Sequence, residues 1–83
     1  MDRIVQDLRN RALSAEPGTC LGTEVSLGEA FGVTAPTLRQ AARQLEHEGV
    51  LHVRRGMRGG YFAARPEVET VTRIATTFLR SRL

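Results

Sequence analysis

Residues 31–49 read FGVTAPTLRQAARQLEHEG, and this stretch decides the fold. Its apolar residues recur at i, i+3, i+4 and i+7, the spacing of one buried helix face: Leu38, Ala41, Ala42 and Leu45. Thr34 is a typical residue for the start of such a helix, and Gly49 for its end. The pattern predicts a helix over residues 34–48, entered through a short turn at Gly32.

A second helix is expected just before this turn, beginning at Thr23 or at Ser26. Thr23 followed by Glu24 gives a cap with an acid in the first turn, whereas Ser26 and Glu29 fit a capping box. We favour Thr23, because the later start leaves barely one turn before Gly32. The residues expected to face inward are Leu27, Ala30 and Phe31.

The region before these two helices contains a further stretch of helical spacing, from Asp2 to about Ala15. It must end before Pro17, because the residue that precedes a proline is pushed out of the helical region. Residues 19–21 are long enough only for a brief strand. Cys20, the one cysteine, excludes a disulfide framework and a cysteine-based zinc finger, and we expect it to be buried as a small apolar residue.

After Gly49 the apolar period changes from 3.6 to 2, which indicates strands over residues 50–55 and 61–64. The glycine-rich residues 56–60 between them predict a hairpin tip. Pro66 can open a last helix with a broad apolar face. The expected fold is therefore α+β: a winged helix-turn-helix, with a three-helix core, a β-hairpin wing and an extra C-terminal helix.

We assign residues 1–65 to this domain. Residues 66–83 then form a linker and helix that either lead to an effector domain absent from this chain or make a dimer contact. We favour the first alternative.

All twelve basic residues are arginines, and the net charge is +3. Six of the arginines lie in residues 35–65, which contain two acids, while the remaining residues hold six arginines and seven acids. Positive charge concentrated in one segment favours a polyanion as partner. Arginine is suited to both phosphate and guanine, so double-stranded DNA is the partner that we expect.

The second helix of a helix-turn-helix lies in the DNA major groove. Opposite its buried face, the helix over 34–48 carries Pro36, Gln40, Arg43 and His47, with Thr37 and Arg39 beside them. Arginine can read guanine, and glutamine can read adenine. The structural alternative is a solvated amphipathic helix with scattered charges.

The predicted hairpin adds Arg54, Arg55 and Arg58 around a tip that includes Gly56. Arginine favours a narrow minor groove, and glycine allows the backbone to approach closely. An ordinary charged hairpin is the structural alternative. A nucleotide-phosphate loop fits poorly, because no Gly-Lys-Ser/Thr follows. The complete set of expected DNA-binding residues is Thr34, Pro36, Thr37, Arg39, Gln40, Arg43, Arg54, Arg55, Gly56 and Arg58.

Catalytic and metal-binding roles find little support in the sequence. His47 and His52 are the two histidines, and they fall on different expected elements with no third strong ligand nearby. We therefore expect no enzyme, no metal site and no cofactor in this segment. Charged residues directly after Met1, the absence of a long apolar run and the single cysteine predict a cytoplasmic protein without a membrane span.

The run EVSLGEAFGVTAPTLRQAARQLEHEGVLHVRRGMRGGYF, residues 24–62, resembles the GntR family of bacterial regulators. Its wing, VRRGMRGGYF, most resembles the FadR-type subgroup, and with the first helix the resemblance covers about residues 1–65. It implies a homodimeric regulator, a repressor, that binds a palindromic operator and has a C-terminal domain for a small metabolite, often an organic acid. By position, Thr37 and Arg39 match DNA contacts of the recognition helix, and Arg55 and Gly56 match the wing tip.

Two positions depart from the FadR-type pattern. This chain has Val25 and Ala35 where the resemblance leads one to expect arginines. The departures put the family's usual operator in doubt for this protein, and Arg43 and Arg54 are candidates to compensate. They also leave open a second function: a winged-helix module that binds protein through a face that no longer reads DNA.

Overall fold

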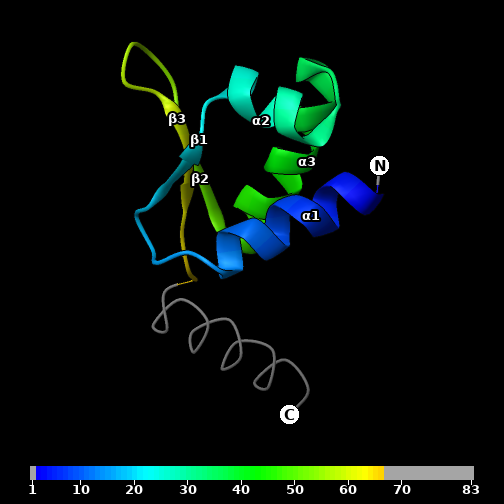
Figure 1. Cartoon of the computed structure of the whole chain (residues 1–83). Coiled ribbons are helices and arrows are strands. Elements are labelled where there is room, and N and C mark those ends of the chain that lie inside the picture. The colour runs from blue at the N-terminus through cyan, green and yellow to red at the C-terminus, as the bar shows by residue number, and fades with distance from the viewer. Residues whose placement is uncertain (1, 67–83) are drawn as a thin grey trace, which may run out of the picture.

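Three helices gather on one side of a small antiparallel sheet in the computed structural model, which describes residues 2–66 (Figure 1). The elements are α1 (Asp2–Leu13), β1 (Cys20–Gly22), α2 (Glu24–Phe31), α3 (Ala35–Glu48), β2 (Leu51–Arg54) and β3 (Gly60–Ala63). This arrangement confirms the predicted α+β winged helix-turn-helix. The helix expected within residues 66–83 lies outside the described residues.

Helix α3 forms as its apolar spacing predicts. Its four predicted inward residues are all buried: Leu38, Ala41, Ala42 and Leu45. Thr34 occupies the N-cap position with an extended backbone. Gly49 ends the helix in the left-handed conformation, at φ 84°, which only glycine adopts without a steric penalty.

Helix α2 begins at Glu24 with Thr23 as its N-cap, which confirms the earlier of the two expected starts. The Ser26 N–H donates to Thr23 Oγ1 at 3.0 Å, and the Thr23 N–H donates to Ser26 Oγ at 2.9 Å. The capping box therefore joins Thr23 to Ser26. Gly32, at φ 68°, ends the helix and makes the short turn into α3.

The inward face of α2 is narrower than predicted. Leu27 is buried and Phe31 is half-buried, but Ala30 is exposed, so the expectation for Ala30 was wrong. The helix is only two turns long, and it lies at the edge of the core, where one large side chain fills the available space.

Helix α1 packs across α3 and supplies Ile4, Val5, Leu8 and Ala12 to the core. It ends at Leu13, two residues earlier than expected. Within residues 2–66, no helix is both long enough and apolar enough to cross a membrane.

A bidentate ion pair ties α1 to the end of α3. Arg9 Nε donates to Glu48 Oε1 at 3.0 Å, and Arg9 Nη2 donates to Glu48 Oε2 at 2.7 Å. These hydrogen bonds hold the pKa of the Glu48 carboxyl below its usual range. Glu48 is one of the two acids in the basic segment, and its charge is offset on the side of α3 that faces α1.

The wing belongs to a three-stranded sheet of order β1-β3-β2. Strands β2 and β3 form the predicted hairpin, with Leu51 opposite Ala63 and Arg54 opposite Gly60. The brief strand expected near residues 19–21 forms as β1 and pairs with β3. Cys20 is exposed, so its predicted burial was wrong: β1 is an edge strand, and no element within residues 2–66 buries this side chain.

Arg65, near the end of the described residues, binds the C-terminal end of α1. Its guanidinium donates to the carbonyls of Ala12, Leu13 and Ala15 at 3.1, 3.0 and 2.8 Å, and to that of Ala64 at 2.7 Å. The last carbonyls of a helix lack the usual partners further along the helix. The Ala12 carbonyl accepts from the Ala15 N–H at 3.3 Å, and Arg65 supplies donors to all three carbonyls. One of the six arginines of the basic segment thus has a structural role.

Candidate nucleic-acid interface

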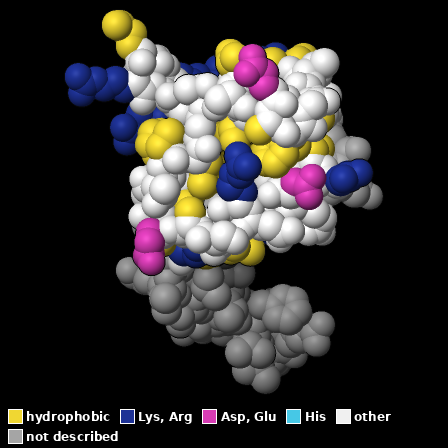
Figure 2. Space-filling view, in the orientation of Figure 1, with side chains coloured by type: hydrophobic (Ala, Val, Ile, Leu, Met, Phe, Trp, Pro, Cys, Tyr) yellow, Lys and Arg dark blue, Asp and Glu magenta, His cyan; other side chains and the backbone are white. Residues whose placement is uncertain are grey.

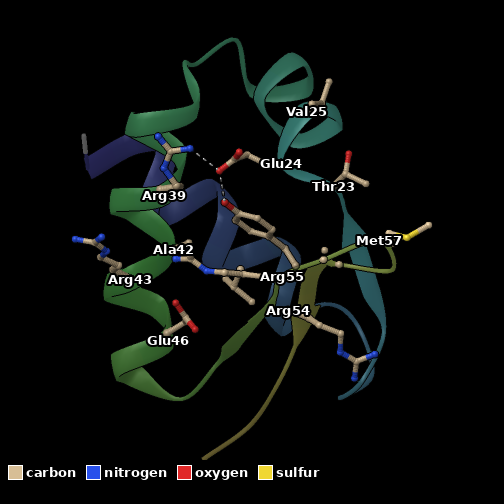
Figure 3. A pocket seen from close by; sticks show the side chains of 15 residues that line it. Thr23, Glu24, Val25, Arg39, Ala42, Arg43, Glu46, Arg54, Arg55 and Met57 are labelled. Atoms are coloured by element: carbon tan, nitrogen blue, oxygen red, sulfur yellow. Dashed lines mark hydrogen bonds and ion pairs between the residues drawn. The ribbon is translucent and has the colours of Figure 1, made fainter.

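A groove runs between α3 and the hairpin, and the start of α2 closes one end of it (Figure 3). Its lining includes five of the ten residues predicted to bind DNA: Arg39, Arg43, Arg54, Arg55 and Gly56. The turn between the helices and the hairpin register together create this groove, because they place α3 and the wing side by side. The structure thus brings the expected reading helix and the expected wing to one surface.

The outer face of α3 has the predicted composition. Pro36, Arg39, Gln40 and Arg43 are all exposed on the side opposite the core. Arg39 and Arg43 are one helical turn apart and line the groove, whereas Pro36 and Gln40 lie outside its lining. An α-helix that presents arginine and glutamine in this way has the donors needed to contact base edges in a major groove.

The first turn of α3 is organised by a pair of threonines. Thr34 Oγ1 donates to Thr37 Oγ1 at 3.1 Å, and in the described part of the chain the Thr34 side chain makes no capping hydrogen bond to the backbone of α3. The backbone N–H groups at this end of α3 therefore keep their capacity to donate to an anion such as a phosphate. Thr34 lies in a shallow hollow between α2 and α3, next to Val25 and Ala35.

The two neighbouring arginines of β2 and the wing point in opposite directions. Arg55 extends toward α3, whereas Arg54 turns away from it (Figure 3). The Arg54 guanidinium lies 5.0 Å from the centre of the Phe62 ring, in cation–π geometry on the outer side of the hairpin. Arg54 belongs to the groove lining, but its guanidinium points away from Arg39 and Arg43 (Figure 3).

Arg58 is exposed at the hairpin tip, outside the lining of the groove. Beside it, Met57 is fully exposed, and Figure 2 shows basic and hydrophobic side chains projecting together from the end of the hairpin. Sequence reasoning did not single out Met57. An apolar residue among arginines is a known composition for segments that enter a minor groove.

Sequence reasoning also missed a polar cluster at the end of the groove beside α2. Arg39 Nη1 donates to Glu24 Oε1 at 3.2 Å, and the Tyr61 hydroxyl donates to the same oxygen at 3.5 Å (Figure 3). Burial raises the pKa of the Tyr61 phenol, and the Glu24 carboxylate raises it further. Glu24 was recognised as a first-turn acid, but its partners lie 15 and 37 residues away, so no local pattern could reveal the cluster.

The raised pKa of Tyr61 leads to a prediction for alkaline solution. The folded state favours the protonated phenol, so its contribution to stability is full below the ordinary tyrosine pKa of about 10 and is lost as the pH rises through the folded value. Unfolding monitored by circular dichroism should show stability falling above that pH. Because Tyr61 is the one tyrosine of a chain without tryptophan, tyrosinate absorbance reports this residue alone.

Tyr61→Phe is the control for this titration, since it keeps the buried ring and removes the proton. We expect the variant to lose less stability than the wild type over the same alkaline range. An equal loss in both proteins would assign the effect to another group.

The charges along the groove are unequally compensated. Arg39 is paired with Glu24, whereas Arg43 and Arg55 form no ion pair within residues 2–66. Glu46 is the other acid that lines the groove. The uncompensated positive charge therefore lies on the third turn of α3, at Arg43, and on the wing, at Arg55.

Metal binding finds no support in the part of the chain that the structure describes. There, no three side chains of histidine, cysteine, aspartate or glutamate come close enough together to hold an ion. His47 is exposed at the end of α3, and His52 is exposed on β2.

Comparisons with known proteins identify the family that the chain resembles. The sequence pattern of bacterial regulatory proteins of the gntR family matches residues 1–60. A protein of Mycobacterium gastri named as an HTH-type transcriptional regulator, RmpR, is 46% identical over 54 residues. The match covers 64% of this chain and 20% of that relative, so the chain spans about a fifth of the relative's length. No solved structure matches the chain significantly.

Proposed function

Because this chain belongs to the gntR family of bacterial regulatory proteins, we propose that it is the DNA-reading domain of a transcriptional regulator. The observation that carries the proposal is the groove between α3 and the wing, where Arg39, Arg43 and Arg55 come from two elements and converge on one surface. In this function the chain recognises DNA and catalyses no reaction.

The proposed docking follows from the shapes of the two elements. The exposed face of α3 lies in the major groove, which is wide enough for a helix, and Arg39 and Gln40 contact base edges there. The hairpin tip, with Arg55, Gly56 and Arg58, lies along the neighbouring minor groove. The start of α3 holds Thr34, Pro36 and Thr37. There the free backbone N–H groups can donate hydrogen bonds to a phosphate.

The wider assembly is a further part of the proposal. We infer a cytoplasmic repressor of the FadR-type subgroup that binds a palindromic operator as a homodimer and responds to a small metabolite. Support comes from the wing sequence in residues 53–62 and from the greater length of the relative, which leaves room for a sensor domain. Residues 66–83 are proposed to lead toward that domain.

The operator is proposed to differ from the one usual in the subgroup. Val25 is 70% exposed at the start of α2, and Ala35 opens α3 in the same shallow hollow. Neither side chain can donate to a phosphate or a base, so two contacts expected from arginine are missing. Arg43 remains as an exposed donor on α3 that forms no ion pair with the other described residues. Arg54 is a weaker candidate for compensation, since its guanidinium stacks on Phe62.

The salt dependence of DNA binding tests the proposal. A duplex is first selected from a random-sequence pool by the wild-type chain, and its affinity is measured over a range of salt concentrations. A DNA reader loses affinity with a log–log slope of about −0.9 for each phosphate that it neutralises. Arg43→Gln is expected to reduce the size of this slope by about 0.9, for the selected duplex and for unrelated duplexes alike.

Arg3→Gln is the matched control, because it removes the same charge from a side chain that is 95% exposed on α1, outside the groove. Its slope should stay close to that of the wild type. If the wild-type chain binds no duplex in a salt-sensitive way, the alternative of a protein-interaction module takes the place of this proposal.

A further inference from the structure

Glu24 is an acid in a groove that is proposed to meet a polyanion, and its position requires an explanation. It is the first residue of α2, and one of its carboxylate oxygens accepts from Arg39 of α3 and from Tyr61 of β3. A single atom therefore connects both helices of the helix-turn-helix with the base of the wing.

The Glu24 carboxylate is held more firmly than an ordinary surface acid. The capping box of Thr23 and Ser26 fixes the first turn of α2, and a helix N-terminus favours a negative charge. Tyr61, which is 3% exposed, cannot move without disturbing the core. The oxygen that receives Arg39 is thus anchored on two sides.

Pairing leaves Arg39 able to contact DNA. Its side chain is 50% exposed, and the structure records one of its five N–H donors bound to Glu24. The remaining donors can still meet the two acceptors of a guanine edge. A free arginine samples many rotamers, whereas this one is held by a neighbour before DNA arrives. Because Glu24 offsets its charge, Arg39 is also less attracted to phosphates at unspecific positions.

We propose that Glu24 is a positioning residue for sequence recognition: it holds the Arg39 guanidinium for a base edge and cancels its charge toward the DNA backbone. This inference rests on the proposed function. Glu24 makes Arg39 a source of selectivity, while Arg43 and Arg55 supply affinity that does not depend on sequence.

Glu24→Gln tests the inference, with Glu46→Gln as the matched control. Both variants remove one negative charge from the lining of the same groove, but within residues 2–66 the structure pairs Arg39 with Glu24 and not with Glu46. Affinities are measured for the duplex that the wild type selects from a random pool and for a scrambled duplex of equal composition. Both variants should bind the scrambled duplex more tightly.

The ratio of the two affinities separates the variants. We expect Glu24→Gln to lower the ratio of selected to scrambled duplex about tenfold, as loss of one ordered base contact would. Glu46→Gln should leave the ratio within about twofold, because removal of unpaired charge acts on both duplexes alike. Equal thermal unfolding midpoints verify that neither variant is compared in an unfolded form.

A double variant shows whether Glu24 acts through Arg39. In the Arg39→Ala background, Glu24→Gln should no longer change the ratio, because the residue that it positions is gone. Additive losses, or an unchanged ratio in the single variant, would overturn the inference while leaving the proposed function intact. Binding of neither duplex by the wild type would instead refute the proposed function, and the inference with it.

Discussion

Arg39→Ala is expected to weaken binding to the selected duplex about 10- to 100-fold, whereas the affinity for unrelated duplexes should fall much less. A bidentate arginine contact with guanine contributes roughly 1–3 kcal/mol of discrimination, and Arg39 is held by Glu24 before binding. Its loss should hardly affect folding, because the ion pair that it forms with Glu24 is half-exposed and such pairs contribute about 0–1 kcal/mol. Fluorescence anisotropy with labelled duplexes measures the first effect, and thermal unfolding the second.

Arg3→Ala controls for the loss of one positive charge. Its side chain lies on α1, away from the groove, so it should lower affinity for both duplexes equally and only slightly. If Arg39→Ala binds the selected duplex as well as the wild type does, the assignment of α3 as the reading helix is wrong. Such a result would favour the wing as the main source of selectivity.

Local patterns in the sequence were sufficient to predict the helices. The four buried residues of α3 recur with helical spacing, and Thr23 and Gly32 mark the ends of α2. Predictions failed where burial depends on distant neighbours. Cys20 lies on an edge strand and Ala30 on a helix at the margin of the core, and neither fact can be read from the adjacent residues.

The site was predictable to a similar extent. Exposure of Arg39, Gln40 and Arg43 follows from helical periodicity alone. The opposite directions of Arg54 and Arg55 also follow from the sequence, since consecutive side chains alternate along the strand predicted over residues 50–55. The link between Glu24 and Tyr61 joins the start of α2 to β3, 37 residues away, and is a tertiary property.

Arg65 belongs to the basic segment but has a structural role and not a DNA-binding one. Its replacement has the largest expected effect on stability. Arg65→Ala removes four hydrogen bonds, three of them to carbonyls at and just beyond the end of α1. Hydrogen bonds from charged groups contribute about 1.5–3 kcal/mol, and the bonds of one guanidinium are lost together, so we expect a loss of about 2–3 kcal/mol. That corresponds to a drop of about 10–20 °C in the unfolding midpoint of a domain of this size.

The planar fork of Arg65, and not its charge alone, is expected to be responsible. Arg65→Lys keeps the charge but offers one compact ammonium, which cannot reach several separate carbonyls at once, so it should recover only a minor part of the loss. Arg58→Ala, at the exposed hairpin tip, should leave the midpoint almost unchanged. Full recovery by lysine would show that interaction with the helix dipole dominates.

At temperatures where Arg65→Ala is folded it should bind the selected duplex like the wild type, since Arg65 lies outside the groove. Arg65 and Arg39 thus separate stability from recognition: each should change one measurement and leave the other nearly constant.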